Sequence, residues 1–356
     1  MNLLFLDNPV GAGYSYVDHH HLDSLTTNVS QISSDLLTAH QALTQKYPFM
    51  KTLPYWIFSE SYGGKMTAAF GVVLFEAISS GEISMNFQGV TLGDSWISGM
   101  SYVDTWADYV NAFSLVDRDQ YDQLTATARK CGAAVELNEW GVATQIWGEM
   151  ESKVSNFTNN ADFYNVLQFD VDTPEGMGSD LDLLDVLKYY HLDHIEGYLQ
   201  RQTVGGGVNE SQISYIMNHE VRDRLGIIPL NVTWGGQSGE VFYMQREDFM
   251  KPVVDDVDKL LEYGLSVNIW NGQLDLICCT LGTLEWLQTL KWTHFKQWFA
   301  AEKVGVLNPT QDDVAYFKKE YRNLKMYYIM KAGHMVPADN PIAALMGLCD
   351  VTGVAF

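Results

Sequence analysis

Positive charge and long apolar runs are both scarce in this sequence. The 356 residues carry 22 Lys and Arg against 44 Asp and Glu, giving a formal net charge of −22, and no basic run stands out. Nucleic acids and anionic membrane surfaces attract basic patches, so we expect neither as a partner. The longest apolar stretch, around Met66–Phe75, is far shorter than the ~20 residues of a membrane-spanning helix, so no span is expected.

Cysteine is also scarce, and its spacing matches no zinc motif. The four residues are Cys131, Cys278, Cys279 and Cys349. Adjacent Cys278 and Cys279 would not readily bridge each other, so any disulfide would reach elsewhere and its pairing stays open. A chain of this length can fold on its hydrophobic core alone, as one α/β domain with an insertion or as two domains.

Two features bear on cellular location, and they disagree. Met1–Leu6 has no basic segment and no cleavage site beside it, so it does not qualify as a signal peptide. Glycosylation sequons favour the secretory pathway, in an extracellular, lysosomal or vacuolar setting. Their acceptors are Asn28, Asn156, Asn209 and Asn231. A chain that lacks its natural N-terminus would reconcile the two observations.

The order of apolar runs and helical periodicities predicts an α/β fold. Strands are expected at residues 2–6, 54–58, 87–92, 266–270 and 324–330, separated by amphipathic helices that include Asp23 to about Lys46 and Met66–Ile78. Such alternation indicates a mostly parallel sheet with helices on both faces. Residues 101–234 have mostly helical patterns, so we expect a helical cap inserted into a core formed by 1–100 and 235–356.

One strand-to-helix turn has the pattern of a nucleophile elbow. The letters SESYGG at residues 59–64 would lift the Ser61 hydroxyl above the sheet and aim the Tyr62 backbone N–H at an oxyanion. Small neighbouring residues would let strand and helix approach closely. The usual pattern is G-x-S-x-G, and Ser59 replaces its first glycine. On this stretch alone, an ordinary turn therefore stays open as an alternative.

Two further polar residues follow the ends of later strands. Asp275 comes after the strand at 266–270, and His334 comes after the strand at 324–330. Parallel strands present such residues at one edge of a sheet. A nucleophilic serine needs a base to take its proton and an acid to hold the tautomer of that base. The order Ser, Asp, His is that of α/β-hydrolases, so the sequence predicts this fold with Ser61, Asp275 and His334 as its triad.

Four blocks of the sequence resemble the serine carboxypeptidases. They are LFLDNPVGAGYSY at 4–16, SESYGG at 59–64, NGQLD at 271–275 and AGHMVPAD at 332–339. Within the family, Ser59 and GDSWIS at 93–98 are most similar to the retinoid-inducible serine carboxypeptidase branch. The resemblance implies Ser61 as nucleophile, His334 as general base and Asp275 as its orienting carboxylate. It also implies peptide substrates with a free C-terminus and no cofactor.

The resemblance gives two more residues a role at the substrate. A protonated Glu60 would donate a hydrogen bond to the substrate's C-terminal carboxylate, whereas an ionised Glu60 would repel it, so an acid pH preference is expected. Met335 is expected to line the pocket of the leaving residue. The alternatives are a strand-end position without a role for Glu60, and plain core packing for Met335.

One part of the family pattern has no counterpart in this sequence. Serine carboxypeptidases carry a Gly-Gly-Pro-Gly loop with a preceding Asn, upstream of the first strand expected here, and that loop supplies the second oxyanion N–H. Loss of one oxyanion donor typically lowers the rate ~100- to 1,000-fold. We therefore expect a truncated form with impaired catalysis.

Two other functions are compatible with these residues. A triad that passes its acyl group to an alcohol would make an acyltransferase, and a non-catalytic secreted pseudoenzyme would fit the missing loop. No metal site is expected, because His19–His21 are better interpreted as a solvated loop, and His191 and His194 as a helix-surface pair. The oligomeric state is not predicted.

Overall fold

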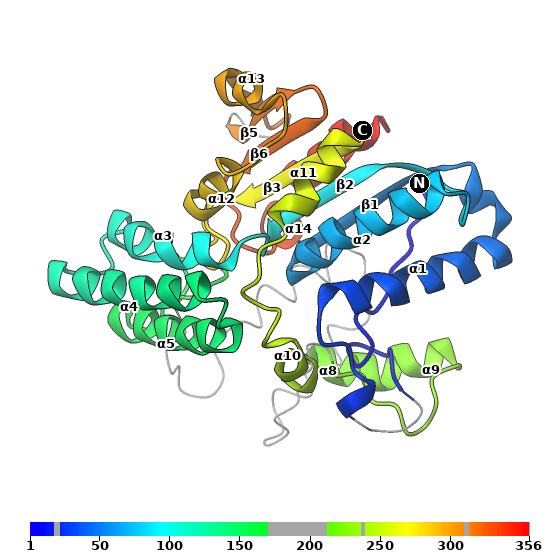
Figure 1. The fold of residues 1–356 in the computed structure, drawn as a ribbon, viewed down its shortest axis with the longest axis horizontal. Coiled ribbons are helices and arrows are strands. Elements are labelled where there is room, and N and C mark those ends of the chain that lie inside the picture. Colours follow the sequence, from blue (N-terminus) through cyan, green and yellow to red (C-terminus); the bar gives the residue numbers. More distant parts are fainter. Residues whose placement is uncertain (18–21, 170–211, 236–238, 310–312, 356) are drawn as a thin grey trace. The chain divides into compact units, whose positions relative to one another are not determined.

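The computed structural model describes residues 1–17, 22–169, 212–235, 239–309 and 313–355 (Figure 1). The chain divides into two compact units. The smaller unit comprises Met1–Thr26 and Val171–Met244, and the larger comprises Thr27–Asp170 and Gln245–Phe356. Ser61, Asp275 and His334 all belong to the larger unit, so the candidate site can be described within it.

A six-stranded mixed sheet forms the centre of the larger unit, in the order β1-β2-β3-β6-β5-β4. The strands are β1 (Pro54–Ser61), β2 (Asn86–Ser95), β3 (Ser266–Gly272), β4 (Lys303–Leu307), β5 (Val314–Tyr321) and β6 (Leu324–Ile329). Neighbours are parallel from β1 to β6, whereas β5 and β4 are added antiparallel. The parallel strands therefore end at one edge, and the residues that follow them meet there.

Helices cover both faces of this sheet, as the alternation of side chains along the strands requires. Ile269 of β3 and Met326 of β6 belong to one buried cluster, together with residues of α2 (Tyr62–Ser79) and α11 (Val254–Glu262). Trp270 belongs to a second cluster, with residues of α15 (Pro341–Thr352). Figure 1 shows α2 and α11 crossing the same face of the sheet.

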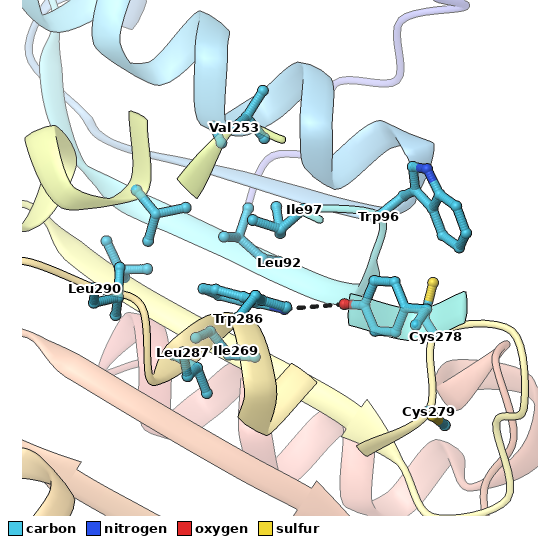
Figure 2. Close-up of a cluster of buried hydrophobic side chains, with 14 of the residues drawn as sticks. Leu92, Trp96, Ile97, Val253, Ile269, Cys278, Cys279, Trp286, Leu287 and Leu290 are labelled. Atoms are coloured by element: carbon cyan, nitrogen blue, oxygen red, sulfur yellow. Dashed lines mark hydrogen bonds between the residues drawn. The ribbon is translucent and has the colours of Figure 1, made fainter. Parts of the chain in front are cut away.

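Trp286 anchors the core close to the strand ends that carry the candidate site. It lies on α12 (Thr280–Leu287), is 1% exposed, and packs among Leu92, Ile269 and Leu287 (Figure 2). Its indole N–H donates to the Tyr102 hydroxyl at 3.0 Å, the contact drawn as a dashed line. The Tyr102 hydroxyl in turn donates to the Ser95 carbonyl at the end of β2. The indole thus stays satisfied while the ring fills the core.

The remaining helices belong to one or the other unit. In the larger unit they are α1 (Val29–Lys46), η2 (Pro48–Lys51), α3 (Gly99–Ala112), α4 (Arg118–Glu136), α5 (Trp140–Thr158), α13 (Phe295–Ala300) and α14 (Val336–Asp339). In the smaller unit they are η1 (Leu22–Ser24), α8 (Gln212–Ile216), the π-helical η3 (Met217–Val221) and α9 (Arg222–Leu225), while α10 (Gly239–Gln245) reaches the boundary. The division into a core and a cap at 101–234 stays a prediction.

The predicted strand at residues 2–6 is wrong. These residues are exposed and pair with none of the described strands. An apolar run becomes a strand only where a neighbouring strand pairs with its N–H and C=O groups, and the composition of the run does not reveal whether that neighbour exists.

Other differences concern element limits and the far edge of the sheet. The first long helix begins at Val29 because Asn28 caps it by accepting from the Gln31 backbone N–H. The helix α11 begins at Val254, after Pro252, since a proline disfavours helical backbone at the residue before it. The antiparallel strands β4 and β5 were not predicted.

Candidate active site

Ser61 occupies a strained turn between β1 and α2. Its backbone has φ 58° and ψ −130°, a region that serine rarely adopts. The Trp96 backbone N–H donates to the Ser61 carbonyl at 2.9 Å, which ties the turn to the end of β2. Because Tyr62 is the first residue of α2, its N–H has no partner within the helix and can donate to an incoming oxyanion. This is the geometry of a nucleophile elbow.

The packing around the elbow explains how Ser59 can replace the usual first glycine. A Cβ built on Gly63 would lie 3.3 Å from the Ser59 Cβ, so the two positions face each other. One glycine of the pair is enough to leave room for the other's side chain. A Cβ on Gly64 would lie 1.9 Å from the Ser95 Oγ, so this glycine lets α2 lie directly against β2.

Asp275 and His334 form a buried acid–base pair. The His334 Nδ1 lies 3.0 Å from the Asp275 Oδ2, and the two side chains are 4% and 0% exposed. The other oxygen of Asp275, Oδ1, accepts from the Cys278 backbone N–H at 3.1 Å. An ionised Asp275 makes His334 carry its proton on Nδ1, which leaves Nε2 as the base.

The structure brings Asp275 and His334 into contact but shows no hydrogen bond between Ser61 and His334 among the described contacts. Such bonds are often long in free enzymes and tighten when substrate binds. Ser61 ends β1 and Asp275 and His334 follow β3 and β6, so all three lie at the same edge of the sheet. The charge of His334 lowers the pKa of Glu60, the neighbour of Ser61.

A short segment after α5 holds together the loops that carry Asp275 and His334, and no sequence pattern indicated it. The Tyr164 carbonyl accepts from the His334 backbone N–H at 2.7 Å. The Phe163 carbonyl accepts from Leu276 at 3.1 Å, and the Val166 N–H donates to Leu274 at 2.9 Å, on the loop that carries Asp275. The Tyr164 ring also lies against His334, with centroids 5.0 Å apart. These bonds fix the separation of the acid and the base.

Glu60 and Met335 are both exposed, and they are the sequence neighbours of Ser61 and His334. Burial by the surrounding protein raises the pKa of Glu60 above its ordinary value, the charge of His334 opposes that rise, and the charge of Asp339 adds to it. The side chain still reaches solvent, which moderates the shift. Met335 is 51% exposed, so plain core packing does not describe it.

Asp94 is a further buried carboxyl at these strand ends, and its contact with the site was missed. Its Oδ1 accepts from the Gly272 backbone N–H at 2.7 Å and from the Asn271 side-chain amide at 2.9 Å. It is 1% exposed and has a positive φ of 39°. The sequence contains one indication of this position: Asp94 follows an apolar run, as Asp275 and His334 do.

The group of possible metal ligands found among the described residues overlaps the acid–base pair. It comprises Asp275, Cys278 and His334, whose ligand atoms lie within 4.8 Å of one another. Burial raises the pKa of the Cys278 thiol, which disfavours the thiolate that a metal requires. All four cysteines are free thiols. His19–His21, His191 and His194 lie outside the described residues.

The serine carboxypeptidase family model matches residues 1–351. This chain belongs to the serine carboxypeptidase family. Retinoid-inducible serine carboxypeptidase of Rattus norvegicus is 39% identical over 350 residues, which are 97% of this chain and 74% of that protein. Serine carboxypeptidase-like 51 of Arabidopsis thaliana is 35% identical over 353 residues, which are 99% of this chain and 76% of that protein.

A solved structure supports the fold of this family member. Kex1(delta)p, a prohormone-processing carboxypeptidase from Saccharomyces cerevisiae, matches with a TM-score of 0.77 at 18% identity, over 98% of this chain and 73% of that chain. The predicted α/β-hydrolase fold is confirmed, as is the resemblance to the serine carboxypeptidases. No described helix has the length and apolar character that a membrane crossing requires.

Proposed function

We propose that Ser61, His334 and Asp275 of this serine carboxypeptidase family member release C-terminal residues from peptides. The observation that carries the proposal is the buried His334–Asp275 contact, at the sheet edge where Ser61 occupies a strained elbow. Positive-φ backbone at a serine is costly, and such strain is concentrated at functional sites. The proposed role of each residue is supported by this geometry and by the chain's membership of the serine carboxypeptidase family.

In the proposed reaction, His334 Nε2 takes the Ser61 hydroxyl proton as Oγ attacks the carbonyl carbon of the last peptide bond. The Tyr62 N–H donates to the oxygen that becomes negative. His334 then protonates the leaving amine, and the C–N bond breaks to leave an acyl-enzyme on Ser61. Water, activated by His334, attacks this ester and restores the free serine. Asp275 holds the imidazole and stabilises its charged form throughout.

Glu60 is proposed to recognise the carboxylate that distinguishes a C-terminal residue. It sits next to Ser61, and its raised pKa keeps more of it neutral than an ordinary glutamate at the same pH. A neutral Glu60 donates a hydrogen bond to the substrate carboxylate, whereas an ionised one repels it. Substrate binding is therefore strongest below the pKa of Glu60 and weakens as the pH rises through it. The exposed Met335 is proposed to contact the leaving side chain.

Glu60→Gln should flatten this pH dependence, because an amide donates at every pH. At neutral pH we expect KM for blocked dipeptides to fall by about 10-fold, since a hydrogen bond to a charged group contributes ~1.5 kcal/mol or more. Steady-state kinetics from acid to neutral pH measure this. The matched substrates are the same peptides with an amidated C-terminus, whose KM should not change. An unchanged profile with the free acids would remove this role from Glu60.

We also propose a secretory-pathway location, extracellular or lysosomal/vacuolar, with glycosylation at the sequons. Asn156 and Asn231 have exposed side chains, which a glycosyltransferase can reach. Asn28 is half-buried and caps α1 through its oxygen, and Asn209 lies outside the described residues. Mass spectrometry of the protein from a secreting host should find glycan on Asn156 and Asn231. Unmodified asparagine at both positions in the secreted product would refute the proposal.

A further inference from the structure

A second buried carboxyl lies beside the segment that leads to Asp275. Asp94, near the end of β2, accepts from Asn271 and Gly272 at the end of β3, and Asp275 follows them three residues later. Both side chains are fully enclosed by protein. Two carboxylates cannot bond to each other unless one of them carries a proton, because each alone is only an acceptor. A hydrogen bond between Asp94 and Asp275 would therefore need a proton on one of them.

The surrounding donors indicate which carboxyl holds that proton. Asp275 accepts from the Cys278 backbone N–H and lies against His334 Nδ1. Asp94 accepts only at Oδ1, while its Oδ2 is buried and meets no N–H or O–H donor among the described residues. An oxygen without a donor is the favourable place for a proton, and a carboxyl with several donors is the favourable place for the negative charge.

We propose that Asp94 is a positioning residue that remains a neutral acid and donates a hydrogen bond from Oδ2 to the catalytic Asp275. The array at the strand ends then has four members: Ser61, His334, Asp275 and Asp94. The inference rests on the proposed roles of Ser61, His334 and Asp275. Asp94 does not touch the substrate; it fixes the direction of the carboxylate that in turn holds the imidazole.

The charges facing Asp94 are consistent with this protonation state. Burial raises the pKa of Asp94 well above its ordinary value of 3.8, and the Asp275 charge raises it further. His334 and the Gly272 N–H oppose that rise. The other titratable groups facing the pair are Glu60 on β1, Cys278 and Cys279 after β3, and Tyr109 on α3. Among these groups no lysine or arginine offsets the negative charge of the pair.

The protonation of Asp94 has consequences for the reaction. With one proton on Asp94, the pair carries a single negative charge, which stabilises the His334 imidazolium in the transition state. If Asp94 ionised, two adjacent buried carboxylates would repel each other, and Asp275 would lose both its donor and its fixed direction. We therefore expect reactivity of Ser61 to fall as the pH rises through the pKa of Asp94.

Asp94→Asn and Asp94→Ala test the hydrogen bond that Asp94 donates to Asp275. The asparagine keeps a donor but cannot ionise, whereas the alanine removes the donor. The Asn oxygen can accept from Gly272 and Asn271 as Asp94 does, and its amide N–H can donate to Asp275. We expect Asp94→Asn to react with a fluorophosphonate within about 3-fold of the wild-type rate at acid pH, and to keep that rate at alkaline pH where the wild type slows. Asp94→Ala should react about 10- to 100-fold more slowly. Thr91→Val, a change at another buried β2 residue whose hydroxyl has no described partner, is the matched control and should react normally.

Two readouts do not depend on Ser61 reactivity. The infrared band of a protonated carboxyl should be present in the wild type at neutral pH and missing from Asp94→Asn. The NMR signal of the His334 Nδ1–H, in the bond to Asp275, should persist in Asp94→Asn and broaden or shift in Asp94→Ala. If this signal is unchanged in Asp94→Ala, or if the infrared band does not differ between wild type and Asp94→Asn, the proposal is overturned.

The pH dependence of stability gives a third readout with a definite sign. The folded protein binds the Asp94 proton more tightly than the unfolded chain, so the stabilisation is complete below pH 3.8 and is lost as the pH rises through the folded-state pKa. The Tm of Asp94→Asn relative to wild type should therefore rise with pH, and a fall would contradict a neutral Asp94. If the wild type is never labelled at Ser61 while these readouts behave as expected, the proposed hydrolase function fails and the placement of the proton stands.

Discussion

Replacing Ser61 with alanine should lower the hydrolysis of blocked dipeptides by roughly 10,000-fold or more. The change removes the oxygen that attacks the peptide carbonyl, so no acyl-enzyme can form, and the other members of a triad do not compensate. The Ser61 side chain does not cap α2, and its place in the turn is held by the backbone bond from Trp96. The fold should therefore survive, and kcat rather than KM should carry the loss.

Ser59→Ala is the matched control for this change. Ser59 is two residues away on β1, and its hydroxyl is buried without a hydrogen-bond partner in the described part of the chain. Its removal should leave the rate within a few-fold of wild type. Equal rates for wild type and Ser61→Ala would show that another group performs the hydrolysis. Product esters formed in the presence of an alcohol, with little peptide hydrolysis, would indicate an acyltransferase.

Asp275→Asn should lower kcat by about 10,000-fold while changing KM little. The Cys278 N–H needs an acceptor, so the new amide would turn its oxygen toward it and its NH2 group toward His334. His334 Nδ1 would then have to accept a hydrogen bond, which places the ring proton on Nε2. In that tautomer the nitrogen required as the base is already protonated.

The measurement for Asp275→Asn is a comparison of kcat, KM and the tautomer. Nitrogen-15 NMR of the histidines distinguishes protonation at Nδ1 from protonation at Nε2. Asp258→Asn, which changes a half-buried carboxyl on α11, is the matched control for loss of one negative charge and should leave kcat unchanged. A loss below 10-fold in Asp275→Asn, with Nδ1 still protonated, would remove Asp275 from the proposed mechanism.

The proposed catalytic residues could be named from the sequence because their signals are local. Ser61, Asp275 and His334 each follow a short apolar run, and the carboxyl ends of parallel strands lie at one edge. The strand at residues 2–6 had the same kind of signal but was wrong, because a strand also needs a partner that the run itself does not specify.

The parts that sequence patterns did not predict depend on contacts between distant segments. Gly63 leaves room for the Ser59 side chain. A motif that treats each position separately does not describe this dependence of one position on the other. Residues 163–166 join the loops of Asp275 and His334 through backbone N–H and C=O groups, which do not depend on the side chain. Asp94 has the right place in the sequence, but its bonds to Asn271 and Gly272 appear only when β2 and β3 are paired.

The central claim, that Ser61 is activated by His334, is tested most directly by mapping the site of fluorophosphonate modification. The wild-type chain is treated at acid and neutral pH, digested, and analysed by mass spectrometry, with Ser61→Ala and heat-unfolded protein as controls. The predicted result is a single adduct on the peptide that contains Ser61, absent from both controls and strongly reduced in His334→Ala. A folded protein with no adduct, or with its adduct on another residue, would contradict the account.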